Sequence, residues 1–493
     1  MTAPPLRPLL PLLPLLLLAG SCSDSPDRGA YPRAPIVLIS LDTVRKDAVS
    51  GFGAPAGKTK ALEALGEEGF RFQNAIAASH HTAPSHATMF TGFTPFVHGV
   101  ALAEGLRVFR LPETLPVLAE VLRDEGYATG AFTDGIQLLP ERGFDRGFDT
   151  FEYETSHLDH KLPAIEEFLD ACGDRPFFLF AHTYRAHQPY RAEPDRLAEL
   201  LEDYDGRFAA PAREVAEFPL DRIRAQDPEA MQRQAELTMA LSPRLWKRKK
   251  DLDFVRALYG AAVEGADGEL GRLLDLLRGR GILDRAIVVV TSDHGEAFVE
   301  HERCAVHMDL WDEVLRVPLV VRLPDRRGAG TDVEGQVGSE RLMPTLLDLV
   351  GLEPPVPTEG TSFAGTLLAG EVVREEPVFS AMYVTGKPEP VMQTMRTRFF
   401  KRFDSLVPRD ELPPRSRHLH PTAFYDLVND EGERHDLTGT GHPEIARFGR
   451  VVRERTEEWA RRRRELGIGG GTLADVSPEE IEAMKGVGYL GDK

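Results

Sequence analysis

Short apolar runs alternate with segments of helical periodicity along most of the chain. The runs are rich in β-branched or aromatic residues and end in polar residues, which is typical of strands buried on both faces of a sheet. Strands are predicted over 34–42, 127–132, 176–184, 286–293, 317–323 and 377–383. Between them, helical spacing predicts helices over 59–72, 112–127, 161–173 and 251–281. This alternation predicts an α/β fold whose central sheet is mostly parallel, with helices on both faces.

The pattern changes in two places. Residues from about 191 to 250 are charged and punctuated by proline, and we interpret them as an insertion of short helices that covers the site. Beyond residue 384, weak alternation over 392–405 and 422–430 predicts antiparallel strands, and a charged helix follows over 446–467. We therefore expect a main domain over 35–384 and a smaller C-terminal α+β subdomain with a short antiparallel sheet over 385–493.

The first 22 residues have the features of an export signal. Arg7 precedes a leucine-rich run that ends at Leu18, and this run is too short and too broken by proline to span a bilayer. It is typical of a secretory signal peptide, and the small residues before Cys22 resemble a lipoprotein lipobox. We expect a bacterial periplasmic or outer-membrane lipoprotein with a tether over 23–34, whose only membrane contact is a lipid on Cys22. The alternative is plain secretion.

The overall charge restricts the possible partners. The 493 residues carry a formal net charge of −19, which disfavours nucleic acid as a partner. It also disfavours an anionic substrate unless a metal or local cations reverse the potential at one site. The cysteines, Cys22, Cys172 and Cys304, do not form a disulfide framework.

Polar residues that can do chemistry follow the predicted strands. Asp42 ends one apolar run, and Asp293 and His294 end another; a carboxylate beside an imidazole is a natural pair of divalent-metal ligands. Thr82 precedes Pro84 at a predicted helix start, where the helix dipole favours an anion. The plain alternatives are helix N-caps for Asp42 and Thr82 and an exposed turn for the Asp-His pair.

Together these stretches resemble the sulfatase family within the alkaline phosphatase superfamily. The resemblance rests on LDTVRKD, APSHATMFTG, GYATG, AHQPY and TSDHGE, in that order along the chain. It implies the sulfatase-like fold, with 35–384 as the catalytic domain. It also implies one divalent metal ion (Ca, Mn, Mg or Zn) held by Asp42, Thr82, Asp293 and His294, with Thr43 as a further ligand. The implied substrate is an anionic ester, such as a sulfated or phosphorylated glycan, lipid headgroup or small molecule.

The chain departs from the usual family pattern at the nucleophile. The family has Cys or Ser, oxidised to formylglycine, in a block that ends in arginine; here Thr82 and His86 stand at those two positions. Threonine cannot give that aldehyde, because its carbinol carbon carries a single hydrogen. The usual Lys-x-His pair after GYATG is also absent. His307 stands at the later substrate lysine, and His187 keeps the histidine of the His-x-Pro pattern.

These residues predict a metal-dependent hydrolase of sulfuric or phosphoric esters. Metal-bound Thr82 attacks in line and forms a covalent intermediate, while His187 and His307 hold the anion or protonate the leaving group. His86 is a candidate for orienting Thr82, or a hydrogen-bonded scaffold. The family resemblance favours a sulfate ester as substrate, whereas the threonine favours a phosphate ester. The sequence therefore does not decide between the two esters. The alternatives are a phosphoglycerol- or phosphoethanolamine-type transferase and a non-catalytic surface lipoprotein that binds an anion or glycan.

Overall fold

The structure is a computed structural model. It describes residues 29–101, 109–135, 137–154, 157–224, 227–242, 246–301, 305–384, 389–411 and 422–469. The expected signal peptide, the lipobox with Cys22, and Cys304 lie outside these ranges. Within the described part of the chain, no helix has the length and apolar character needed to cross a membrane.

A mixed, mostly parallel sheet forms the centre of the molecule. Its strands are β1 (Ile36–Leu41), β2 (Phe70–Ile76), β3 (Ala128–Asp134), β4 (Thr150–Glu154), β5 (Phe177–Thr183), β6 (Ile287–Thr291), β9 (Arg316–Val317), β10 (Leu319–Arg322) and β11 (Thr331–Gly338). They run in the order β11-β2-β10-β6-β1-β5-β3-β4, with β9 paired to β2. From β6 to β4 every neighbouring pair is parallel, and β10 is antiparallel to β6 and β2. The predicted fold class is confirmed.

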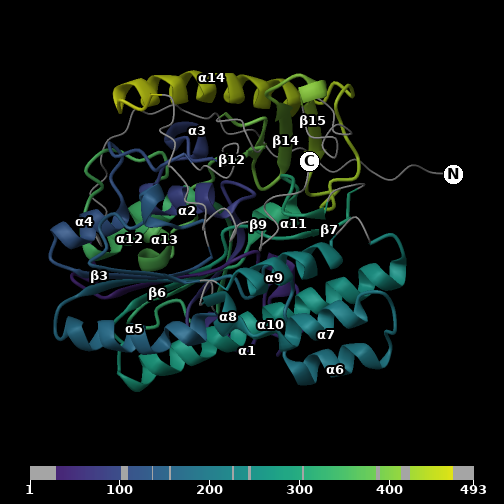
Figure 1. The fold of residues 1–493 in the computed structure, drawn as a ribbon. Coiled ribbons are helices and arrows are strands. Elements are labelled where there is room, and N and C mark those ends of the chain that lie inside the picture. Colours follow the sequence, from purple (N-terminus) through teal and green to yellow (C-terminus); the bar gives the residue numbers. More distant parts are fainter. Residues whose placement is uncertain are drawn as a thin grey trace, which may run out of the picture.

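Helices cover both faces of this sheet (Figure 1). One face carries α1 (Lys60–Glu67), α5 (Leu158–Cys172) and α10 (Lys249–Gly279); the other carries α2 (Thr82–Thr91), α4 (Leu118–Asp124), α12 (Leu342–Val350) and α13 (Ala364–Ala369). Strand β1 shows why both faces must be covered: Ile36 and Leu38 enter one apolar core, whereas Val37 and Ile39 enter the other. Because side chains alternate along a strand, its continuous apolar run needs a helical layer on each side.

The region expected to be an insertion is helical. It holds α6 (Pro194–Glu202), α7 (Ala209–Glu217), α8 (Leu220–Arg224) and α9 (Pro228–Ala240), which precede the 31-residue α10. Shorter elements elsewhere are α3 (Pro95–His98), α11 (Asp312–Leu315), β7 (Ala297–Phe298) and β8 (Ala305–Val306). In Figure 1 the helices α6 to α9 gather beside α10 at one end of the molecule.

A second, antiparallel sheet lies above the helices of the α2 layer (Figure 1). It consists of β12 (Val378–Met382), β13 (Met392–Arg396), β14 (Phe400–Ser405) and β15 (Thr422–Asp426), in that order. Helix α14 (Pro443–Glu465) crosses the same side of the molecule, and the ring of Trp459 stacks on that of Phe96 at 4.0 Å. The backbone N–H of Ala381 on β12 donates to the carbonyl of Ala78 at 2.9 Å, which joins the small sheet to the main layers.

Several predicted elements are wrong in type or place. The helix predicted over 59–72 ends at Glu67, and Phe70–Ile76 is a strand of the central sheet. The strand predicted over 377–383 is β12 of the small sheet, so that sheet begins before residue 385. The edge strands β4 and β11 lack an apolar run because much of each is exposed. In the expected tether, Gly29 and Tyr31 donate backbone hydrogen bonds to the end of α12, so residues 29–34 are not a free linker.

Buried charges join the small sheet to the catalytic layers. Asp312, the first residue of α11, accepts hydrogen bonds from Arg396 on β13 and Lys401 on β14, each with a shortest distance of 2.8 Å. Lys401 also lies 2.9 Å from a carboxylate oxygen of Glu433. All four side chains are buried. Removing one partner from such a group leaves an uncompensated buried charge.

We expect Lys401→Met to lower the free energy of unfolding by about 3 kcal/mol, because Glu433 and Asp312 would lose their shared cation in a buried place. Urea denaturation followed by circular dichroism measures the change. The matched control is Lys249→Met, which removes an exposed pair with Asp253 and should change stability little. Equal, small effects of the two substitutions would contradict a stabilising role for the buried group.

Candidate active site

Strand register brings the two aspartates together. Strands β1 and β6 are parallel neighbours in which Ser40 lies opposite Thr291, so Asp42 and Asp293 each follow two residues later at the same sheet edge. One ligand atom from each of Asp42, Asp293 and His294 lies within 4.8 Å of the others, and all three side chains are buried. Ligands of α/β sheets occupy this carboxyl edge.

Thr82 is the first residue of α2 and points at this edge. Its hydroxyl donates a hydrogen bond of 3.1 Å to Asp42 Oδ2. The hydroxyl of Tyr184 donates to Thr82 Oγ1 at 3.3 Å, and the backbone N–H of Ala83 donates to Gln137 Oε1 at 3.1 Å. The predicted helix start is confirmed. It places Thr82 where the unpaired N–H groups and the dipole of a helix favour an anion.

The donor atoms at this edge fit a divalent cation. Asp42 Oδ1, Thr43 Oγ1, Asp293 Oδ2 and His294 Nε2 are buried, and none has a hydrogen-bond partner among the described residues. Unsatisfied buried polar atoms are costly, and four of them in neighbouring residues indicate a missing common partner. Burial and the nearby Asp293 carboxylate raise the pKa of Asp42 well above its ordinary value. A bound cation would remove that repulsion, and oxygen and imidazole donors suit such an ion.

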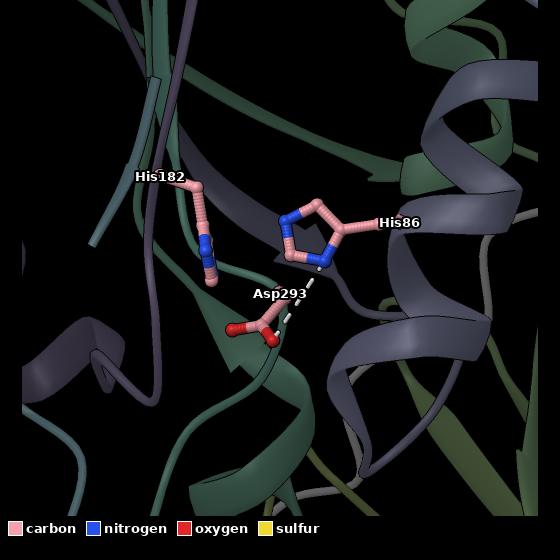
Figure 2. A group of neighbouring side chains, drawn as sticks. All are labelled: His86, His182 and Asp293. Atoms are coloured by element: carbon pink, nitrogen blue, oxygen red, sulfur yellow. Dashed lines mark ion pairs between the residues drawn. The ribbon is translucent and has the colours of Figure 1, made fainter. Parts of the chain in front are cut away.

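Two further imidazoles approach Asp293 (Figure 2). His86 on α2 places Nδ1 4.0 Å from Asp293 Oδ2, and His182 on β5 places Nε2 3.4 Å from Asp42 Oδ2. Both nitrogens of His86 have other close partners, the carbonyl of Thr82 at 2.8 Å and the hydroxyl of Ser40 at 2.9 Å. Through these two hydrogen bonds, His86 links α2 to β1. Its assignment as a catalytic residue stays a prediction.

His187 and His307 lie next to His294. Their ring centres are 5.3 Å apart, and the ring of His307 is 4.7 Å from that of His294. His307 Nδ1 is 3.6 Å from the carboxylate of Glu296, which is fully buried. Burial raises the pKa of Glu296 to about 7, and burial together with His307 lowers that of His187 to about 3.

The structure therefore gathers every predicted site residue at one sheet edge. It also brings to the site Tyr184 and Gln137, which no motif assigns to it, as well as His182 and Glu296. For His182 a signal exists in the sequence, because it ends a predicted strand as Asp42 and Asp293 do. Tyr184 and Gln137 lie in loops after strands, and only the fold shows that they reach Thr82 and its neighbour.

A family model described as Sulfatase matches residues 35–352, well over half of the chain. The chain belongs to the sulfatase family. Membership makes this protein a hydrolase of the sulfuric and phosphoric ester class, in a family that is generally metal-dependent. Among the described residues of this sulfatase-family chain, Asp42, Asp293 and His294 form one of the groups that could hold the ion.

Curated relatives match across most of their length. An ulvan-active sulfatase of Formosa agariphila is 25% identical over 440 residues, which are 85% of this chain and 80% of the relative. An N-acetylglucosamine-6-O-sulfatase of Bacteroides thetaiotaomicron is 25% identical over 419 residues, 71% of this chain and 74% of that one. A multifunctional alkaline phosphatase superfamily protein of Trinickia caryophylli is 24% identical over 410 residues, 69% and 78% of the two chains.

Solved structures share the fold. A protein in complex with its substrate D-glucosamine-2-N,6-O-disulfate has a TM-score of 0.66 and 21% identity, covering 88% of this chain and 98% of that one. A phosphonate monoester hydrolase of Agrobacterium radiobacter has a TM-score of 0.63 and 21% identity, covering 87% and 96%. These likenesses confirm the layered architecture on which the site is built.

We expect divalent metal to stabilise the folded protein through Asp293. At free metal about one hundred times the Kd, binding adds about 2.7 kcal/mol to the free energy of unfolding. Thermal melts with Ca²⁺, Mn²⁺, Mg²⁺ or Zn²⁺ after chelation measure this gain, and Asp293→Asn should lose most of it. The control Asp267→Asn changes a buried carboxylate that accepts hydrogen bonds from the backbone N–H groups of Ala61 and Leu62. A gain that Asp293→Asn keeps in full would place the ion elsewhere.

Proposed function

We propose that the protein hydrolyses sulfuric or phosphoric esters with the hydroxyl of Thr82 as the nucleophile. The observation that carries the proposal is the position of Thr82 Oγ1, 3.1 Å from Asp42 Oδ2 at the start of α2. There the hydroxyl adjoins the buried atoms of Asp42, Asp293 and His294 that lack a hydrogen-bond partner among the described residues. If Thr82 were only a helix N-cap, no potential metal-ligand atoms would need to gather around its hydroxyl.

The first step forms a bond from Thr82 Oγ1 to sulfur or phosphorus and breaks the bond from that atom to the leaving alcohol. The proton of the hydroxyl points at Asp42 Oδ2, and the Tyr184 hydroxyl donates to the same Oγ1, which fixes the direction of attack. The first turn of α2 presents its dipole to the charged oxygens of the ester. A divalent ion held by Asp42, Thr43, Thr82, Asp293 and His294 would supply charge neutralisation and a lower pKa for the hydroxyl.

We assign protonation of the leaving oxygen to His307. Its Nδ1 faces the buried Glu296 carboxyl group at 3.6 Å, so a proton can be held between the two groups. His187 is neutral near pH 7 because its pKa is lowered to about 3, and its Nδ1 lies 2.7 Å from the carbonyl of Gln188. We assign it a hydrogen bond to the ester rather than proton transfer. Water then attacks sulfur or phosphorus and gives its proton to His307, the bond from that atom to Thr82 Oγ1 breaks, and Asp42 returns the proton to the Thr82 hydroxyl.

The threonine decides how the intermediate breaks down. A formylglycine hydrate can expel sulfate by collapse to the aldehyde, whereas a threonine ester has no such route. Water must attack sulfur or phosphorus itself, and this step is easier for a phosphoester than for a sulfate ester. The chemistry of a threonine nucleophile therefore supports phosphate esters as substrates. The curated relatives, whose names state sulfatases, support sulfate esters.

We expect Thr82→Ala to lower kcat at least about a thousandfold, because it removes the atom that forms the covalent bond. The assay compares aryl sulfate, phosphate monoester, phosphodiester and phosphonate ester on metal-loaded protein. Thr82→Ser should retain measurable turnover. Thr91→Ala, on the same helix, removes a buried hydroxyl bonded to the carbonyl of Ala87 and serves as the control. If the Thr82→Ala protein keeps the kcat of the unchanged protein, the proposal is wrong.

The role of His307 predicts a dependence on the leaving group. His307→Gln should slow esters of alkyl alcohols about a hundredfold but 4-nitrophenyl esters much less, because the nitrophenolate needs no proton to depart. His187→Gln should slow both substrates by similar factors. Steady-state kinetics across a series of leaving-group pKa values measures the two slopes. A steeper slope for His187→Gln than for His307→Gln would reverse the assignment.

A further inference from the structure

A pocket adjoins the nucleophile. Tyr184 and His187 form its inner wall, and the same Tyr184 donates its hydroxyl to Thr82. The pocket extends from there towards α7, α8 and α9, in the region predicted to cover the site. An ester bound at Thr82 would therefore direct its alcohol part into this space.

The outer wall is apolar. It is formed by Val215 on α7, Phe218 between α7 and α8, Leu220 on α8 and Leu237 on α9. Pro189 continues this surface towards His187. Val215 and Leu237 are buried, whereas Phe218 and Leu220 are half-buried and keep accessible surface. A pocket wall of this composition favours an apolar occupant.

Most polar side chains around the pocket already form hydrogen bonds or ion pairs with other residues of the protein. Arg185 donates to the carbonyl of Arg191 and to the carboxylate of Glu193, and its Nε lies 3.5 Å from Glu269. The amide of Gln188 donates to the carbonyl of Leu241 at 3.1 Å. These hydrogen bonds leave the carbon atoms of both side chains to line the space.

Four other polar groups complete the lining. Asp134 accepts a hydrogen bond from the backbone N–H of Tyr184 at 2.9 Å. Arg191 donates to the carbonyl of Phe218 at 2.8 Å, and His157 Nδ1 lies 3.4 Å from Glu269. Among the described residues, the amide of Gln234 has no hydrogen bond, and Arg191 keeps further N–H groups. The amide of Gln234 and the remaining N–H groups of Arg191 are therefore the main polar groups that this wall still offers to a ligand.

We propose that this pocket binds the leaving-group alcohol of the substrate and selects an apolar one, aryl or alkyl, over a sugar. The inference rests on the proposed function, because it takes Thr82 as the point of attack. A buried pyranose would bring several hydroxyl groups, each of which needs a hydrogen-bond partner, and the lining has too few to offer. The relatives whose names state a sugar sulfate thus differ from this chain in the part of the substrate beyond the ester.

The test compares benzyl, hexyl and glucose-6-yl esters of the anion that the protein turns over. All three release a primary alcohol, so their intrinsic reactivities are close. We expect kcat/KM for the benzyl and hexyl esters to exceed that for the glucose ester about tenfold or more. A preference for benzyl over hexyl identifies an aryl occupant, and the reverse identifies an alkyl chain. A preference for the glucose ester would overturn the proposal.

Leu220→Asn provides the matching variant, because Leu220 is half-buried and its loss should be tolerated by the fold. It should lower kcat/KM for the benzyl and hexyl esters about tenfold more than for the glucose ester. Leu201→Asn, also half-buried but on α6 and outside the pocket lining, should leave all three values unchanged. Equal losses on all three esters with Leu220→Asn would contradict apolar selection.

A binding measurement separates this inference from the proposed function. If no ester is turned over in a Thr82-dependent way, the proposed function fails, but the pocket can still be tested. Calorimetry on the metal-loaded protein should show tighter binding of benzylphosphonate than of methylphosphonate, with the difference lost in Leu220→Asn. Equal affinities in the unchanged protein would overturn the pocket assignment.

Discussion

The site depends on two carboxylates that the fold holds side by side in a buried place. Asp42 and Asp293 meet because β1 and β6 are parallel neighbours with Ser40 opposite Thr291, and both strands are fixed by apolar layers on each face. Burial and proximity raise the pKa of Asp42, so two ionised carboxylates at this edge need compensating positive charge. The rest of the site is arranged around that requirement.

Hydrogen bonds satisfy part of these two carboxylates, and two buried imidazoles whose pKa burial lowers lie beside them. His86 and His182 approach Asp293 and Asp42, the backbone N–H of Thr43 donates to Asp293 at 3.2 Å, and the hydroxyl of Thr82 donates to Asp42. These contacts still leave one oxygen on each aspartate without a hydrogen-bond partner among the described residues. A divalent ion is the partner that fits all of the remaining atoms, which links metal binding to the stability of this sheet edge.

Sequence pattern predicts most of this arrangement for a definite physical reason. Fully buried strands such as Ile36–Leu41 and Ile287–Thr291 must be continuously apolar, so the polar residues that end them stand out, and parallel order places those ends together. Edge strands such as Thr331–Gly338 escape prediction because exposure lets polar residues and glycine occupy them. The strand Phe70–Ile76 was hidden by the helical spacing that precedes it. Tyr184 escapes prediction, and the role of Glu296 stays open, because both depend on side-chain direction after a turn, which no periodicity encodes.

The departures from the family pattern share one electrostatic consequence. Where the family block ends in arginine, His86 is buried and bonded through both ring nitrogens, and burial lowers its pKa. His307 stands at the position of the later substrate lysine, and Phe132, Thr133, Asp134 and Gly135 stand where a Lys-x-His pair is usual. Permanent cations are thus replaced by groups that are neutral or titratable, in a chain whose net charge is −19. The bound metal and the start of α2 would then hold most of the anionic group of the ester. The alcohol part of the ester would be recognised by the apolar pocket beyond Tyr184.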